Sequence, residues 1–177
     1  MPRLHAARTV DTLLAAMQLI TFTVGGQAFA IESRSVIEVL PLVPHRPVPL
    51  VPDYVSGMFT YRGCLVPVID LGVRLQGRPV ERRLSTRIIV VEFIVPPSSA
   101  AAATPVRAGL VAENVIATCR AEEAEASYPA LQLENAPFMA GILRLKGTSV
   151  HLLAVERLLP PGIIAGLFPR PAERALP

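Results

Sequence analysis

The stretch GMFTYRGCLVPVIDLGVRL, residues 57–75, carries the pattern from which the fold can be inferred. Its middle is a dense apolar run, as in a buried strand. Two features interrupt that run: an arginine followed by a glycine at Arg62–Gly63, and a proline at Pro67. Glycine tolerates the positive φ angles of a hairpin tip, so the interruption indicates a turn between two strands.

We therefore expect strands over residues 57–62 and 65–70, joined by a turn at Gly63–Cys64. Pro67 has no backbone N–H to donate and is expected at an edge or a bulge. The following DLGVRL predicts a short helical turn, because Asp70 has a side chain suited to the N-cap position.

A similar stretch, GILRLKGTSVHLLAVERLL, follows 84 residues later, at 141–159, without a gap. A second echo relates residues 30–36 (AIESRSV) to residues 109–115 (GLVAENV), at an offset of 79. Repeats of this size are typical of two similar subdomains. The matched positions of the first echo are Gly57, Arg62, Gly63 and Leu75 with Gly141, Lys146, Gly147 and Leu159.

Elsewhere the chain alternates short apolar runs with turn signals, which predicts about ten strands and an all-β protein of closed or nearly closed barrels. Gly25–Gly26 predicts a two-residue hairpin. The remaining segments are a strand at 35–43, a proline-rich extended loop at 41–54, a strand at 86–95, a low-complexity loop at 96–105, strands over 106–119, a polar connector at 120–137, a hairpin at 138–155, a short helix near 156–159, and a loose tail after Pro160.

Composition narrows the class of protein. Hydrophobic residues make up 51% of the 177, which excludes a disordered chain. The net charge of +3 is too small to indicate a particular partner. Cys64 and Cys119 lie in apolar surroundings and form no metal-binding pattern, so we expect no metal, no cofactor and a reducing compartment. The apolar run at 10–24 is interrupted and too short for a membrane span.

The sequence gives little support to two classes of function, namely an enzyme and a nucleic-acid-binding protein. A hydrolase needs a nucleophile, a base and an orienting group. Cys64 could be a nucleophile, but no recognisable sequence motif pairs it with a histidine that could act as the base. The segment VGGQAF is too short for a phosphate-binding loop and opens a strand. A small β-barrel that binds nucleic acid is the alternative function, but it needs a basic stripe with exposed aromatics, whereas the arginines are dispersed and tryptophan is absent.

Five blocks, taken in order, resemble the CheW family of chemotaxis adaptors, over roughly residues 18–160. The Gly–x4–Arg-Gly–x3–Pro–x2–Asp pattern of residues 57–70 is the most specific single match. The blocks are FTVGGQAFAIESRSVIEVL, VPDYVSGMFTYRGCLVPVIDLGVRL, TRIIVVEF, RAGLVAENVIATC and MAGILRLKGTSVHLLAVERLL.

The resemblance implies an all-β fold of two interlocked five-stranded SH3-like β-barrels with short helical turns. It implies one CheW-like domain at 18–160, with subdomains at about 18–85 and 86–160, and the residues outside it are expected to be a short N-terminal segment at 1–17 and a flexible, Pro/Gly-rich tail at 161–177. It also implies a cytoplasmic, non-enzymatic adaptor recruited to membrane-associated receptor arrays. Its partners would be the cytoplasmic tip of a methyl-accepting chemoreceptor and the regulatory domain of a CheA-type histidine kinase, with no nucleic acid and no membrane insertion.

Six residues match family positions tied to this coupling: Val36, Glu38, Gly57, Arg62, Gly63 and Gly109. Val36 would give apolar contact to the receptor. Arg62 would form hydrogen bonds or an ion pair near the groove between the barrels. Gly57 and Gly109 would let backbones approach closely.

The chain departs from the family in three places. The loop at 96–105 is longer, TYRG replaces the commoner NLRG, and Ala154 stands where the first repeat has Asp70. The second helical turn should therefore lack a cap. We expect a divergent, stand-alone adaptor rather than a fragment of a kinase or of a CheV-like fusion. Flagellar, pilus-based and second-messenger outputs all remain open.

Overall fold

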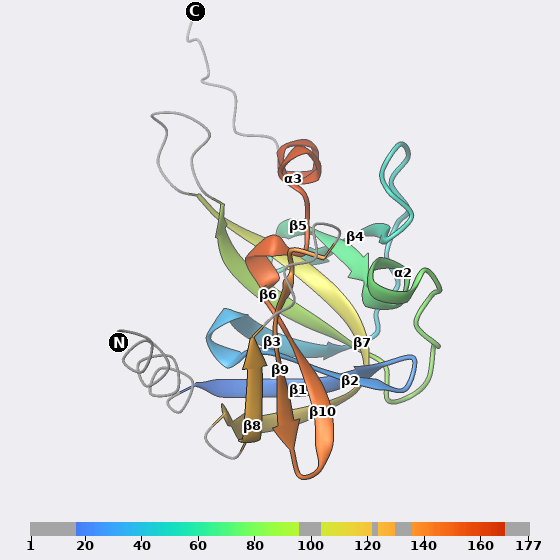
Figure 1. Cartoon of the computed structure of the whole chain (residues 1–177). Coiled ribbons are helices and arrows are strands. Elements are labelled where there is room, and N and C mark those ends of the chain that lie inside the picture. The colour runs from blue at the N-terminus through green and yellow to red at the C-terminus, as the bar shows by residue number, and fades with distance from the viewer. Residues whose placement is uncertain (1–16, 96–103, 122–123, 130–135, 169–177) are drawn as a thin grey trace, which may run out of the picture.

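The computed structural model describes residues 17–95, 104–121, 124–129 and 136–168. These residues form ten strands with a few short helical elements (Figure 1). The expected N-terminal segment at 1–16 and most of the low-complexity loop, 96–103, lie outside the described residues. The strands are β1 (Gln18–Val24), β2 (Gln27–Glu32), β3 (Val36–Pro41), β4 (Val55–Tyr61), β5 (Cys64–Asp70), β6 (Arg87–Val95), β7 (Thr104–Arg120), β8 (Ala124–Pro129), β9 (Met139–Leu145) and β10 (Thr148–Leu153).

Three hairpins have two-residue turns in which both residues adopt positive φ angles. These turns are Gly25–Gly26, Arg62–Gly63 and Lys146–Gly147, with φ values from 48° to 82°. Positive φ at both central positions matches the right-handed twist of the flanking strands, which explains the glycine in each turn. The middle turn falls one residue earlier than the expected Gly63–Cys64.

The strands form two sheets that share β7. Sheet A contains β1, β2, β8, β9 and β10 with the C-terminal part of β7, and sheet B contains β3, β4, β5 and β6 with its N-terminal part. Figure 1 shows β7 running from one sheet into the other. Asn114 has a φ of 47°, and the register between β1 and β7 shifts on both sides of Thr21. These irregularities let one strand serve both sheets.

The pairing confirms the internal repeat residue by residue. In sheet B, β5 pairs in parallel with β7, with Val68 opposite Gly109. In sheet A, β10 pairs in parallel with β2, with Leu152 opposite Ala30. These pairs are related by the same offsets of 84 and 79 as the sequence echoes. The two repeats are therefore exchanged by an approximate two-fold relation.

Each sheet takes strands from both repeats, so the two halves of the chain are interlocked. The exchange of strands between the halves extends through both sheets: β1 and β2 pair with β7 and β10, and β3 pairs with β6. Among the described residues, neither sheet closes into a continuous hydrogen-bonded ring. The unjoined edges are β3 and β4 in sheet B, and β7 and β8 in sheet A.

Most buried apolar side chains belong to one large cluster built from both sheets, including Phe22, Phe29, Phe59 and Tyr61. A smaller cluster around Leu19, Ala30, Leu143, Val150 and Leu152 lies within sheet A. The large shared core explains why the two sheets form one unit rather than two separable barrels.

Two segments differ from the sequence expectations. Residues 161–167, expected in a flexible tail, form helix α3 (Pro161–Leu167), whose Ile164 and Leu167 are buried against the main core. Proline at the first helical position favours this start. The expected polar connector at 120–137 contains β8, which adds an edge strand beside β9.

The helical turns that follow the two repeated hairpins differ in length. Helix α2 (Leu71–Gln76) begins at Asp70, whose Oδ1 accepts hydrogen bonds from the backbone N–H groups of Gly72 and Val73 at 2.8 and 3.2 Å. It ends at Gly77 with a φ of 70°. The predicted N-cap is confirmed. In the second repeat Ala154 precedes only a 3-10 turn, η3 (Val155–Arg157), and makes no side-chain cap.

Arg74 joins the two repeats. Its guanidinium carbon lies 5.2 Å from the centroid of the Tyr54 ring and 4.4 Å from that of Phe138, and its Nε donates to the Leu158 carbonyl at 2.9 Å. Tyr54 and Phe138 occupy equivalent positions of the two repeats, 84 residues apart, as do positions 74 and 158. Burial lowers the pKa of Arg74, and the cation–π contacts with the two rings offset part of the lost hydration.

Candidate functional site

The unjoined edges of sheet B are linked by side chains at the tip of the β4–β5 hairpin. Glu38 extends from β3, and its Oε2 accepts a hydrogen bond from the Tyr61 hydroxyl at 2.7 Å. The same oxygen accepts one from Nη2 of Arg62 at 3.0 Å. One carboxylate oxygen thus connects β3 to the hairpin across the seam, and we call Glu38, Tyr61 and Arg62 the tip cluster.

The cluster is electrostatically coupled. The hydrogen bond from Tyr61 holds the pKa of Glu38 below its ordinary value; burial opposes this shift, and the hydrogen bond and charge of Arg62 add to it. The same hydrogen bond to Glu38 raises the pKa of Tyr61. Both shifts favour the state in which Tyr61 is protonated and Glu38 is charged, which is the state that makes both bonds.

Arg62 remains available to a partner although it is paired. Its side chain is 66% exposed, and its guanidinium carbon lies 5.1 Å from the centroid of the Tyr61 ring. The bond to Glu38 uses one of the five guanidinium N–H groups. The planar group is therefore held by a ring and a carboxylate, and this bond leaves its other N–H groups for a partner.

A second ion pair and two exposed apolar side chains lie on the same sheet. Arg107 of β7 donates through Nε to Oε2 of Glu92 on β6 at 2.8 Å, and its charge also acts on Tyr61. Leu65, on the second strand of the hairpin, is 70% exposed, and Ile94, near the end of β6, is 55% exposed. Sheet B therefore exposes both charged and apolar side chains, and singly exposed apolar side chains are ordinary on a protein surface.

The six predicted site residues have different surroundings. Glu38, Arg62 and Gly63 meet at the hairpin tip, where Gly63 supplies the turn with a φ of 80°. Val36 opens β3 opposite Val91 and is half-buried against the main core. Gly57 and Gly109 are buried, so the structure does not bring all six to one surface.

Both buried glycines allow close approach within the chain itself. Gly57 has a φ of 153°, and a Cβ there would collide with the carbonyl oxygen of Arg46. That approach lets Arg46 and Met58 exchange two backbone hydrogen bonds of 2.8 Å, which hold the proline-rich loop against β4. At Gly109 a Cβ would lie 2.8 Å from Cγ2 of Ile88. These contacts give both glycines a structural role.

Sequence reasoning did not identify the Tyr61 hydroxyl or the Glu92–Arg107 pair. In the sequence, Tyr61 stands where the family pattern has a leucine, which indicates an apolar ring and gives no sign of a bond to the hydroxyl. Its ring is indeed buried, but its hydroxyl reaches Glu38. A signal for the ion pair was present, because Glu92 and Arg107 interrupt two apolar strands that a hairpin would place side by side.

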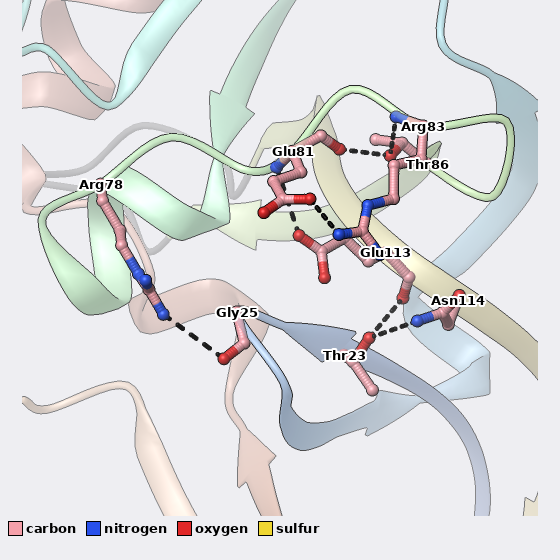
Figure 2. Close-up of polar contacts among 8 residues, drawn as sticks. All are labelled: Thr23, Gly25, Arg78, Glu81, Arg83, Thr86, Glu113 and Asn114. Carbon is pink, nitrogen blue, oxygen red and sulfur yellow. Dashed lines mark hydrogen bonds and ion pairs between the residues drawn. The ribbon is translucent and has the colours of Figure 1, made fainter.

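A pocket of about 430 Å³ lies elsewhere, between the β1–β2 turn, the loop after α2 and the bend of β7 (Figure 2). Its polar contacts tie the chain to itself. The backbone N–H of Glu81 donates to Oε1 of the buried Glu113 at 3.2 Å, and Asn114 Nδ2 donates to the Thr23 hydroxyl at 2.9 Å. Arg83 pairs with Glu81. These hydrogen bonds and the ion pair hold the loop after α2 in place. We therefore assign the pocket residues a structural role and take the tip cluster as the candidate site.

Among the described residues, the helices are all too short to reach across a lipid bilayer.

Comparison with known proteins agrees with this architecture. Residues 18–161 match the family model of the CheW-like domain. The chain is 35% identical over 75 residues to the chemotaxis protein CheW of Rhizobium meliloti (strain 1021), a region covering 42% of this chain and 48% of that protein. It is 31% identical over 75 residues to CheW of Helicobacter pylori, covering 42% and 46%. The matched region thus spans about half the length of these curated relatives.

Among solved structures, the scaffolding protein TtCheW of Thermoanaerobacter tengcongensis superposes with a TM-score of 0.68 at 21% identity. The superposition covers 84% of this chain and 90% of that one, and it confirms the all-β fold expected from the sequence. Since the family model spans most of the chain, the protein belongs to the CheW-like domain family.

Proposed function

We propose that this chain is a non-enzymatic chemotaxis adaptor that couples a chemoreceptor to a CheA-type histidine kinase. Membership of the CheW-like family over residues 18–161 supports the adaptor role. Its partners would be the cytoplasmic tip of the receptor and the regulatory domain of the kinase. It would act in the cytoplasm, recruited to receptor arrays at the membrane.

The exposed tip cluster is the observation that carries this proposal within the chain. Arg62 faces solvent on a hairpin tip, where its side chain contributes little to the core. An exposed ion pair of this kind adds only about 0–1 kcal/mol to stability. Removing a charge that is hydrogen-bonded and buried in an interface commonly costs about 2–5 kcal/mol of binding. Removing the Arg62 side chain should therefore cost more free energy of binding than free energy of unfolding.

Glu38 and Gly63 would contribute to the same interface through the geometry of the tip. Glu38 keeps Oε1 free of the tip cluster's bonds, since Oε2 accepts both of them. Val36 would add apolar contact through the part of its half-buried side chain that is exposed at the start of β3. The buried Gly57 and Gly109 would act through the fold by keeping the neighbouring loop and strands in place.

The experiment is a titration of the purified chain with two ligands from its own genome: the kinase regulatory domain and a cytoplasmic receptor fragment. We expect the wild type to bind at least one of them. Arg62→Ala should weaken that binding by about 30-fold or more, at about 1.4 kcal/mol per tenfold, with an unchanged circular dichroism spectrum and unfolding midpoint. No binding of either ligand by the wild type would refute the proposed function.

Lys146→Ala is the matched control, because Lys146 occupies the equivalent turn of the second repeat with the same φ of 48°. Among the described residues it forms no ion pair. The control variant should therefore bind with nearly the wild-type affinity. Equal, negligible losses for both variants would mean that both side chains are solvated turn charges.

A further inference from the structure

The tip cluster contains a contact that a leucine at position 61 could not make. The family pattern noted in the sequence has leucine before the arginine, and this chain has tyrosine. The Tyr61 ring is 5% exposed, so it fills the core as a leucine would. Its hydroxyl, however, donates to Oε2 of Glu38 across the seam between β3 and β4. The aromatic residue therefore adds a polar function to a core position.

This hydroxyl limits the freedom of Glu38, and Glu38 in turn limits that of Arg62. Glu38 lies 39% exposed at a sheet edge, where a carboxylate held only by an exposed arginine would sample several rotamers. The 2.7 Å bond from a ring that is fixed by packing restrains it. Arg62 then meets two fixed groups, Oε2 of Glu38 and the face of the Tyr61 ring.

We propose that Tyr61 is a positioning residue: through Glu38 it holds the Arg62 guanidinium in one orientation, ready to bind a hydrogen-bond acceptor, above all a carboxylate, on the protein partner. A planar guanidinium recognises a carboxylate with two parallel hydrogen bonds, so its orientation matters as well as its charge. Holding a flexible side chain in its bound geometry before binding lowers the entropic cost of association. This inference rests on the proposed function.

The test is a double-mutant cycle on binding, using the full chain and whichever of the two ligands is weakened by Arg62→Ala. Tyr61→Phe removes the hydroxyl and keeps the ring. We expect it to weaken binding by about three- to tenfold, the size of one net hydrogen bond. In a Glu38→Ala background there is nothing left to position, so the same substitution should change affinity by less than about twofold.

Tyr54→Phe is the control for loss of a tyrosine hydroxyl as such. Tyr54 is half-buried and packs against Arg74, and its hydroxyl makes no contact with Glu38. This variant should bind like the wild type. Unfolding curves of every variant establish that each is folded at the titration temperature, and the pKa of Glu38, followed by NMR, should rise in the Tyr61→Phe variant because the largest cause of its depression is lost.

The outcomes separate the two proposals. If the wild type binds neither ligand, the adaptor function itself is wrong. If the wild type binds and Tyr61→Phe binds equally well, the positioning role is overturned while the function stands. If Tyr61→Phe weakens binding by the same factor with and without Glu38, the hydroxyl acts on the fold or on the partner directly, and the route through Glu38 is refuted.

Discussion

The two repeated hairpins, residues 57–75 and 141–159, share a backbone and differ in what their side chains do. Both turn through residues with nearly equal φ angles, 48° and 80° at Arg62–Gly63 and 48° and 75° at Lys146–Gly147. The N–H of Asp70 donates to the Tyr54 carbonyl, and that of Ala154 donates to the Phe138 carbonyl, both at 2.8 Å. Hydrogen bonding of the main chain is thus conserved between repeats.

The side chains at matched positions have diverged. Asp70 caps a helix of six residues, whereas Ala154 precedes a 3-10 turn of three. Arg62 is held by a carboxylate and a ring, whereas Lys146 forms no ion pair among the described residues. The comparison teaches that turn geometry fixed the architecture of both repeats, while individual side chains gave the first repeat its additional structure and its candidate interface.

The largest effect should come from removing the cap in the first repeat. Asp70 accepts hydrogen bonds from three backbone N–H groups, those of Gly72, Val73 and Val80. Asp70→Ala should lower the free energy of unfolding by about 2 kcal/mol, the upper end for a helix cap. Urea unfolding measures this loss. Asp70→Asn, which keeps an acceptor oxygen, should lose less, and an equal loss for both variants would argue against the cap.

The turn glycines should behave alike if the backbones are equivalent. A Cβ at Gly63 or at Gly147 would meet no atom within 4 Å, so the cost of alanine is that of the positive φ alone. Gly63→Ala and Gly147→Ala should each lower the free energy of unfolding by about 1 kcal/mol. Thermal or urea unfolding of the pair tests this, and losses that differ by more than about twofold would show that the two turns are not equivalent.

Adding the missing cap should make the second repeat resemble the first. Ala154 has φ and ψ of −88° and 107°, close to the −78° and 107° of Asp70. Ala154→Asp should therefore raise the free energy of unfolding by about 0.5–1 kcal/mol. Ala154→Asn serves as a cap without the charge. A loss of stability in both variants would mean that the second turn cannot accept a capped geometry.

The smallest effect should be a pH dependence of the free energy of unfolding that arises from the tip cluster and has no counterpart at the Lys146 turn. The pKa of Glu38 is below its ordinary value of 4.5, so its contribution to stability is complete above about pH 5 and is lost as the pH falls through the lowered pKa. The pKa of Tyr61 is above 10.0, so its contribution is complete below about pH 9 and is lost as the pH rises through the raised pKa.

The difference in urea midpoint between wild type and Tyr61→Phe should therefore be greatest near neutral pH and shrink toward both extremes. The matching Lys146→Ala variant should follow the wild-type profile throughout. A constant difference from pH 3 to pH 11 would show that the Tyr61 hydroxyl does not act through Glu38.

Much of the fold could be predicted from local patterns. The Gly25–Gly26 turn, the strand over residues 87–95 and the Asp70 cap follow from glycine, β-branched residues and a capping side chain. The echoes at offsets of 84 and 79 predicted two similar halves, and the parallel pairs Val68–Gly109 and Leu152–Ala30 are related to each other by those two offsets. The sequence did not predict which repeat each strand would pair with, because short sequence patterns do not specify pairing between strands that are far apart in the chain.

The site was only partly predictable for the same reason. Glu38 and Arg62 could be selected from the family pattern, but the bond between them depends on how β3 faces β4 across an unpaired seam. Gly57 also shows the limit: the sequence indicated a close backbone approach, and only the structure shows that Arg46 is what approaches. Helix α3 was missed because its glycines and prolines suggested a loop.

Arg74 sets a limit on how far two duplicated halves can remain copies of each other. Its guanidinium lies between Tyr54 and that residue's counterpart Phe138, and it bonds to the carbonyl at its own counterpart position, Leu158. Both members of one matched pair contact this single guanidinium, and the second pair supplies the guanidinium and its acceptor. An arginine at position 158, as the two-fold copy of Arg74, would bring a second cation toward the same two rings. This contact is therefore incompatible with exact symmetry between the repeats, and the leucine at 158 is where the sequence departs from it.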